Sequence, residues 1–173
     1  MAEDIEQDGK PAAGLPWQAL VHDALPRVAA GAGTPQFAQH LIDALRQVLE
    51  FDWWMVMVYR EHANPEMLHE NFTGSWRARG LTTYVGGFYV LDPFYIMSRS
   101  LDHPEVCRLG DIAPDGFLES EYHRAHYASG RIGDEINYLW PLEPGVTLAI
   151  SLERSEHCVP FGDADVGRME AVQ

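Results

Sequence analysis

The stretch from Asp52 to Arg60 constrains the fold of this chain more than any other. Successive side chains of a strand point to opposite faces of a sheet. Here both sets are apolar: Trp53, Met55, Met57 and Tyr59 point one way, and Trp54, Val56 and Val58 point the other. We therefore expect a central strand with other parts of the chain packed on each of its faces.

Four more segments have the pattern of strands. In the last of them, Val146, Leu148, Ile150 and Leu152 alternate with Thr147, Ala149, Ser151 and Glu153, which predicts one buried face. Asn64-Pro65 and Glu143-Pro144-Gly145 mark turns that join neighbouring strands. The expected strands are residues 66–72, 106–109, 135–141 and 146–154.

Helices are predicted from apolar spacing and from start signals. Asp92-Pro93 is such a signal, because aspartate caps free backbone N–H groups and proline at the first helical position loses no needed donor. Asp115 is a plausible cap for a further helix that Gly130 ends. The expected helices are residues 17–30, bent or interrupted at Pro26, then 35–49, 92–101, 115–130 and one from residue 163 onward, and residues 74–87 receive no assignment.

This order of elements lacks the regular alternation of strands and long crossover helices that a doubly wound parallel sheet requires. We expect an α+β fold, an α/β/α sandwich with a central antiparallel sheet of about five strands. Residues 1–14 are expected to be a flexible acidic leader and residues 15–173 a single domain. The final helix has barely begun at Gln173, which suggests a piece of a longer protein.

The charge of the chain limits its partners. Its net charge is −14 and its pI is near 4.8, which opposes contact with the phosphates of nucleic acids or with anionic membranes. No stretch approaches the roughly 20 apolar residues of a membrane span. Cys107 and Cys158 are isolated thiols, which favours a reduced, cytoplasmic setting or at most one disulfide.

The run from Tyr84 to Tyr95 has the composition of a small-molecule pocket. It holds five aromatic residues and one carboxylate, Asp92, and no cation. Ligand pockets combine much apolar surface with a few polar groups that orient the ligand. The same run also fits an aromatic core segment that ends in a helix cap, and both interpretations stay open.

Several local sequences follow one another in an order that resembles the N-terminal sensor half of LuxR-type bacterial transcription regulators. They are the tyrosine-rich run, Asp92-Pro93-Phe94-Tyr95, residues 109–117 (LGDIAPDGF), Ser120-Glu121-Tyr122-His123, Asp134-Glu135, and residues 148–153. The resemblance covers roughly residues 35–173. It implies a GAF-like or autoinducer-domain-like sandwich, a homodimer formed through the outer helices, and DNA binding only through a C-terminal domain absent from this chain.

The resemblance also suggests a ligand site. In autoinducer-binding members, the aspartate that Asp92 matches accepts a hydrogen bond from an acyl-homoserine lactone, and a tryptophan follows soon after. No tryptophan lies between Trp76 and Trp140, so a different effector, such as an amine or an aromatic metabolite, is as plausible. The expected ligand-binding residues are Trp54, Trp76, Tyr84, Phe88, Asp92, Phe94, Phe117 and Tyr138.

Two other classes of function remain. His123 and His126, three residues apart on an expected helix, could bind a metal in a metal-dependent enzyme, with Glu119, Glu121, Cys107 or Cys158 completing the shell. The chain has no nucleophile elbow and no glycine-rich nucleotide loop, so we expect neither an enzyme nor a cofactor. A ligand-free interaction module, with its sheet filled by its own aromatic residues, is the third class.

Overall fold

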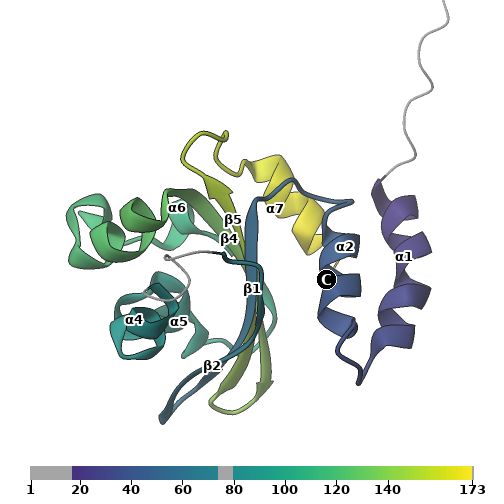
Figure 1. The fold of residues 1–173 in the computed structure, drawn as a ribbon, viewed down its shortest axis with the longest axis horizontal. Coiled ribbons are helices and arrows are strands. Elements are labelled where there is room, and N and C mark those ends of the chain that lie inside the picture. Colours follow the sequence, from purple (N-terminus) through teal and green to yellow (C-terminus); the bar gives the residue numbers. More distant parts are fainter. Residues whose placement is uncertain (1–16, 74–79, 173) are drawn as a thin grey trace, which may run out of the picture.

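The computed structural model describes residues 17–73 and 80–172. A five-stranded antiparallel sheet, in the order β2-β1-β5-β4-β3, forms the middle layer, and helices cover both of its faces (Figure 1). This arrangement confirms the expected α+β sandwich. The strands are β1 (Trp53–Arg60), β2 (Ala63–Glu70), β3 (Glu105–Arg108), β4 (Ile132–Glu143) and β5 (Val146–Ser155).

The helices divide into two layers. In Figure 1, α1, α2 and α7 lie on one side of the sheet, and α4, α5 and α6 lie on the other. The first layer consists of α1 (Trp17–Gly31), α2 (Phe37–Leu45) and α7 (Asp163–Glu170). The second layer includes α4 (Thr82–Val85), the 3₁₀ turn η2 (Phe88–Leu91), α5 (Pro93–Ser98), α6 (Leu109–Ile112), the 3₁₀ turn η3 (Phe117–Glu119) and the π-helix η4 (His123–Ala128).

The central strands β1 and β5 are covered on both faces. The expectation for β1 is confirmed, since its residues from Trp54 to Tyr59 are all buried. The expectation of a single buried face for β5 is wrong: Thr147, Ala149, Ser151 and Glu153 are buried as well as Ile150 and Leu152. The reason is position, because β5 lies between β1 and β4 and has a helical layer above and below it.

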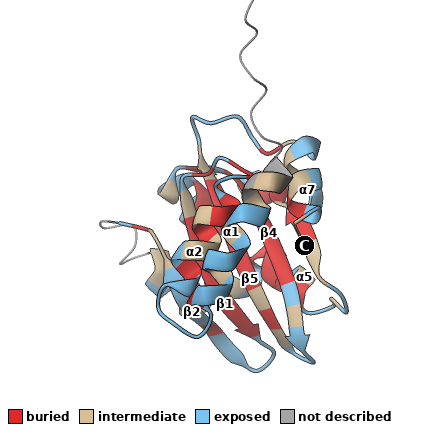
Figure 2. Cartoon of the chain, turned by 90° about the vertical axis from the view of Figure 1, so that its right-hand side faces the viewer, coloured by how far each residue is buried: buried red, intermediate tan, exposed pale blue. Residues whose placement is uncertain are grey.

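Each face of the sheet carries its own core. The core beneath α2 and α7 contains Val56, Ile136, Ile150 and Leu152, together with Trp54. The opposite core lies beneath α4 and α5 and is built largely from tyrosine, phenylalanine and methionine side chains. Figure 2 shows the buried residues concentrated in the sheet, while α1, in front, is largely exposed.

Local chemistry accounts for the start of α5 and for the turn between β4 and β5. Asp92 caps α5 as expected, accepting a hydrogen bond from the backbone N–H of Phe94. Helix α1 runs through Pro26 without an interruption, and α2 is shorter than the expected 35–49. The hairpin between β4 and β5 turns at Gly145, whose φ of 76° is a conformation that glycine adopts without strain.

The single helix expected for residues 115–130 is wrong. The chain forms η3 and then η4, separated by Ser120 in an extended conformation. The hydroxyl of Ser120 accepts a hydrogen bond from the backbone N–H of His123, so Ser120 rather than Asp115 provides the start signal. A serine hydroxyl competes well for free N–H groups, which is why it interrupts an otherwise helical pattern here.

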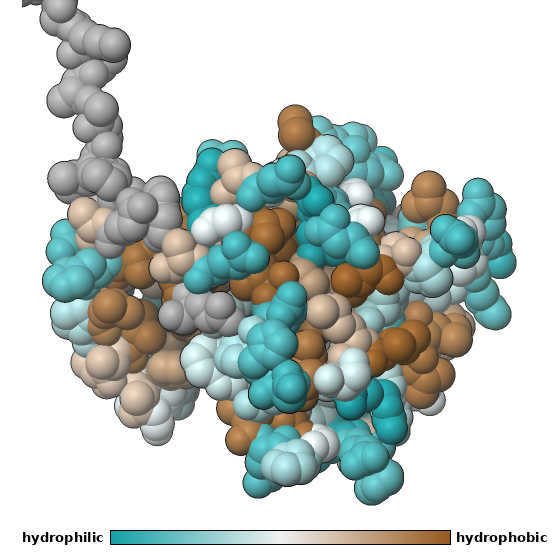
Figure 3. Space-filling model, turned by 180° about the vertical axis from the view of Figure 1, so that it is seen from behind, coloured by the Kyte–Doolittle hydropathy of each residue, from teal (hydrophilic) through white to brown (hydrophobic). Residues whose placement is uncertain are grey.

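The surface carries apolar side chains in several places. On the face seen in Figure 3, they form separate patches among hydrophilic residues. None of the helices in the described part of the chain is long and apolar enough to cross a membrane. The large apolar residues with the highest exposed fractions are Leu25, Val90, Ile96, Leu118, Leu142 and Val159.

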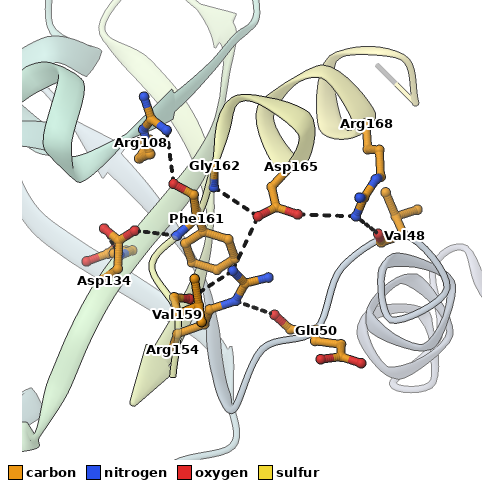
Figure 4. Close-up of polar contacts among 11 residues, drawn as sticks. Val48, Glu50, Arg108, Asp134, Arg154, Val159, Phe161, Gly162, Asp165 and Arg168 are labelled. Atoms are coloured by element: carbon orange, nitrogen blue, oxygen red, sulfur yellow. Dashed lines mark hydrogen bonds and ion pairs between the residues drawn. The ribbon is translucent and has the colours of Figure 1, made fainter. Parts of the chain in front are cut away.

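Polar contacts fasten the C-terminal segment to the sheet (Figure 4). The guanidinium of Arg154 on β5 donates to the carbonyls of Glu50 (2.9 Å) and Val159 (3.1 Å), and it pairs with Asp165 on α7 (3.3 Å). The same group lies 4.0 Å from the centre of the Phe161 ring. Arg154 thus connects β5 with the loop before β1, with the segment before α7 and with α7 itself.

A carboxylate on the neighbouring strand adds to this fastening. Asp134 on β4 accepts a hydrogen bond of 2.7 Å from the backbone N–H of Phe161, and Arg108 donates to the carbonyl of the same residue at 2.9 Å. Both backbone polar groups of Phe161 are therefore satisfied, which allows its ring to be buried.

We predict that Arg154→Lys lowers the free energy of unfolding by roughly 1–3 kcal/mol, because a lysine keeps the charge but cannot reproduce the planar fork of donors. Arg60→Lys is the control, since its pair with Glu66 is exposed and should contribute little. Chemical denaturation of the purified chain measures both. Equal effects of the two substitutions would contradict this role for Arg154.

Candidate functional site

Asp92 is the centre of a buried hydrogen-bond cluster between α5 and the sheet. One of its oxygens caps α5 through the Phe94 N–H at 2.8 Å. The other accepts from the hydroxyls of Tyr84, at 2.5 Å, and Tyr59, at 3.2 Å. The two hydroxyls lie 2.8 Å apart. Because Tyr59 is on β1, these bonds tie the second helical layer to the sheet.

Glu135 is the centre of a second buried cluster on the same face. Its Oε1 accepts hydrogen bonds from the Asn137 amide at 2.5 Å and the Ser151 hydroxyl at 2.6 Å. Its Oε2 accepts from the hydroxyl of Tyr127 in η4 at 2.6 Å. The strand register aligns the strand residues, with Asn137 opposite Ser151 and Glu135 opposite Glu153. The carboxyl is fully satisfied by neutral donors.

Glu153 differs from these two acids. Its side chain is completely buried, at 0% exposure, and neither carboxyl oxygen has a hydrogen-bond partner among the described residues. Burying a carboxyl group without such partners is costly, so an unpaired one is unusual in a core.

His126 completes a buried group of three. One ring nitrogen of His126 and one carboxyl oxygen each of Glu135 and Glu153 lie within 4.8 Å of one another. The His126 ring stacks on Tyr122 at 5.4 Å between centres, and it lies 5.6 Å from the ring of Tyr84. η4 is a π-helix, a rare geometry that is frequently found at functional sites.

Burial shifts the protonation of this cluster. Loss of hydration raises the pKa of Glu135 to about 7, reinforced by the nearby Asp92 carboxylate. Burial likewise raises the pKa of Glu153 well above its ordinary value, with Glu135 and Asp92 adding to the effect. Burial lowers the pKa of His126 to about 4. Burial therefore favours the protonated form of Glu153 and the uncharged form of His126.

Two cavities border this face. One of about 470 Å³ lies at the end of the sheet where β1 meets β2 and β4 meets β5, and its walls include Tyr59, Tyr95 and Thr147. The other, of about 160 Å³, lies toward the opposite end. Its walls are Trp53, Phe72, Thr73, Gly130 and Ile132.

Solved structures with this architecture identify the fold. The ligand-binding domain of VqsR from Pseudomonas aeruginosa aligns with a TM-score of 0.75 and 26% sequence identity, over 87% of this chain and 88% of that one. The N-acylhomoserine lactone-dependent LuxR family transcription factor CepR2 from Burkholderia cenocepacia aligns with a TM-score of 0.64 and 18% identity, over 90% and 87%.

The chain has the fold of a LuxR-type ligand-binding domain. Escherichia coli SdiA is also similar, with a TM-score of 0.61 and 14% identity over 90% of this chain and 63% of that one. No protein-family profile matches the sequence, and no curated protein sequence matches it. The sequence resemblance to LuxR-type sensor domains is thereby confirmed by structure.

Five of the eight residues expected to bind a ligand lie on one face of this LuxR-type fold. Tyr84, Asp92, Phe94 and Phe117 are buried there and Phe88 packs against them. Trp54 and Tyr138 lie in the core on the opposite face, so they do not share a site with Asp92. Trp76 falls outside the described residues. Whether any of the eight contacts a ligand stays a prediction.

The structure adds residues that the sequence pattern did not single out. The buried polar clusters also contain Tyr59, Glu135, Ser151 and Glu153. The only signal for them in the sequence was the presence of acidic or polar residues within expected strands.

The metal hypothesis paired His126 with His123. In the described part of the chain, the side chains that lie close enough together to bind a metal are those of His126, Glu135 and Glu153, and His123 is not among them. Cys107 and Cys158 are both free thiols.

The buried acids make stability depend on pH. The folded state keeps protons on Glu135 and Glu153 that the unfolded state releases above its ordinary pKa of 4.5, so these groups lower stability as pH rises. His126 acts in the opposite sense, because its folded pKa of about 4 lies below the ordinary 6.5. Its effect is complete by about pH 6.5, and above that pH the acids alone remain.

We therefore predict that the melting temperature falls as the pH rises from about 6.5 into the alkaline range, and that Glu153→Gln removes part of this fall. Glutamine keeps the shape of the protonated acid but cannot ionise. Thermal melts across this range measure the slope, and the exposed Glu121→Gln serves as control. If wild type and Glu153→Gln have the same slope, Glu153 does not titrate as described.

Proposed function

We propose that this chain is the small-molecule-sensing domain of a LuxR-type regulator, and that its effector binds the sheet face that carries Asp92 and Glu135. One observation carries the proposal: this face buries a carboxyl group, Glu153, that no described residue satisfies. A core that evolved only to pack has no use for such a group, whereas a ligand that donates hydrogen bonds would satisfy it.

The two flanking cavities support this placement. Tyr59 lines the larger one and also donates to Asp92, so a ligand there would touch the hydrogen-bond cluster directly. Its volume of about 470 Å³ falls within the range of ordinary small-molecule sites. We propose an amine or an aromatic metabolite as the class of effector. The N-acylhomoserine lactone dependence of CepR2 makes such lactones a necessary comparison.

The other functional classes find less support. An interaction module with a filled core would leave no buried carboxyl unsatisfied, in contrast to Glu153. A metal-dependent enzyme that uses His123 and His126 would need both histidines at one site. Among the described residues, the group spaced for a metal contains only His126 of the two. Regulatory ligand binding fits the similarity to VqsR and needs no catalytic group.

We propose further that the chain forms a homodimer through its outer helices and that a DNA-binding domain follows it in the full-length protein. Helix α1 lies on the outside of the fold and packs on α2 (Figure 1). Light scattering of the purified domain measures the first point. Reading the gene beyond the codon for Gln173 tests the second, and a stop codon there would exclude a DNA-binding domain in this position.

We predict that an effector at a hundredfold excess over its dissociation constant stabilises the domain by about 2.7 kcal/mol. This corresponds to a rise in melting temperature of roughly 5–10 °C for a domain of this size. A thermal-shift screen with primary amines, aromatic metabolites and acyl-homoserine lactones measures it. The absence of any stabilising compound from a broad screen would favour the filled-core interaction module.

We predict that Tyr59→Phe reduces the shift caused by a compound that binds in the larger cavity, because Tyr59 lines that cavity and its hydroxyl donates to Asp92. The cost to the unliganded domain should be only about 1 kcal/mol, as for a single hydrogen bond. Tyr89→Phe is the matched control, since its hydroxyl bonds to Asn64 outside the cluster. Equal ligand responses of the two variants would exclude Tyr59 from the site.

A further inference from the structure

Three carboxyl groups are buried on one face of the sheet without a cation. Asp92, Glu135 and Glu153 are each less than 5% exposed, and none of them forms an ion pair with a described lysine, arginine or histidine. Each of the first two accepts three hydrogen bonds from neutral groups of the protein. Glu153 accepts none, so the missing donor belongs at Glu153.

The position of Glu153 allows a donor to meet other acceptors as well. Glu153 lies directly opposite Glu135 in the β4–β5 ladder, and an oxygen of each lies within 4.8 Å of a ring nitrogen of His126. Two carboxyl oxygens and a ring nitrogen thus lie near one another. A group that donates several hydrogen bonds and carries a positive charge would supply the donor that Glu153 lacks and would also suit the neighbouring Glu135 carboxyl.

Resting on the proposed function, we propose that the effector carries a protonated amine, and that Glu153, with Glu135 and His126, binds its ammonium group. An ammonium nitrogen hydrogen-bonds at about 2.8 Å, and acceptors in tetrahedral directions around it then lie about 4.6 Å apart. The limit of 4.8 Å on the distances among the three atoms accommodates this arrangement. The same limit admits a zinc ion, whose ligands at about 2.0–2.1 Å would lie about 3.4 Å apart, and the chelator in the test below excludes that ion.

The surroundings suit the rest of such a molecule. The ring of His126 is flanked by those of Tyr122 and Tyr84, so the ammonium site has aromatic neighbours, which attract cations. The cavity of about 160 Å³ lies close by, because Trp53 in its wall is the residue directly opposite Glu153 in the β1–β5 ladder. Its size favours a compact amine with a short apolar or aromatic body.

Binding has a proton balance that can be measured. Burial favours the protonated Glu153 carboxyl, which meets either an ammonium ion or a free amine. An ammonium ion displaces the carboxyl proton to solvent, whereas a free amine takes that proton and becomes the ammonium ion. In both cases the complex contains a carboxylate paired with an ammonium group, and an amine that is protonated in solution releases up to one proton per molecule bound.

The test uses the full chain with a chelator present, and primary amines such as butylamine and phenethylamine as probes. Isothermal titration near pH 7 compares each amine with the alcohol of the same carbon skeleton. We expect the amine to bind at least tenfold more tightly than the alcohol. Repeating the titration in buffers of different ionisation enthalpy should reveal the released proton, which a purely structural role of Glu153 would not produce.

Glu153→Gln should weaken amine binding at least tenfold, while the exposed control Glu121→Gln should leave it unchanged. If Glu153→Gln does not fold, the proton release of the wild type and the preference for amine over alcohol still decide the question. Amine binding without proton release and without an effect of Glu153→Gln would overturn the assignment of these residues.

Other outcomes separate this inference from the proposed function. If acyl-homoserine lactones or neutral aromatic compounds bind and amines do not, the domain is a sensor but the amine inference is wrong. If zinc added without chelator stabilises the wild type and not Glu153→Gln, while amines have no effect, the group is a metal site instead. If no compound of any class binds, both the inference and the proposed function fail.

Discussion

Coverage of β1 and β5 on both faces is the constraint on which the rest of this structure depends. A strand in this position must be apolar on both sides or find partners for its polar groups. The face beneath α2 and α7 takes the first solution, with valine, isoleucine and leucine side chains. The face beneath α4 and α5 takes the second, and there Glu135, Asn137 and Ser151 satisfy one another. The polar face is therefore the one on which the proposed effector site lies.

Asp92 contributes both to the start of one helix and to the packing of that helix on the sheet. Its capping of α5 is a local effect that holds in any helix that begins with Asp-Pro. Its bonds to Tyr84 and Tyr59 join segments that are distant in the sequence. One side chain thus both starts the helix and anchors the helical layer to the sheet.

The sequence predicted what depends on near neighbours. The two-sided apolar pattern of β1, the cap at Asp92 and the hairpin turn at Gly145 all rest on residues close together in the chain, and the structure has each of them. The layered sandwich followed from the order of these elements. The break at Ser120 was missed, because a serine hydroxyl within an apolar helical pattern carries no signal until its partner is known.

The candidate site was predictable only in part for the same reason. Asp92 and its aromatic neighbours lie in one continuous stretch, so their composition pointed to a pocket. Glu135, Glu153 and His126 come from two strands and a π-helix, and their proximity depends on the strand register and on the path of the chain between them. Trp54 and Tyr138 were grouped with Asp92 by residue type, yet strand alternation carries their side chains to the other side of the sheet.

The β4–β5 ladder has a further consequence at two neighbouring rungs. Glu135 faces Glu153 on one rung, and Asp134 faces Arg154 on the next. The first pair points into the polar face beneath α5, while the second holds Phe161 and α7 on the far side of the sheet. A single peptide bond on each strand separates the two. The acids beneath α5 and the contacts that hold α7 are thus joined covalently through adjacent residues of the same two strands.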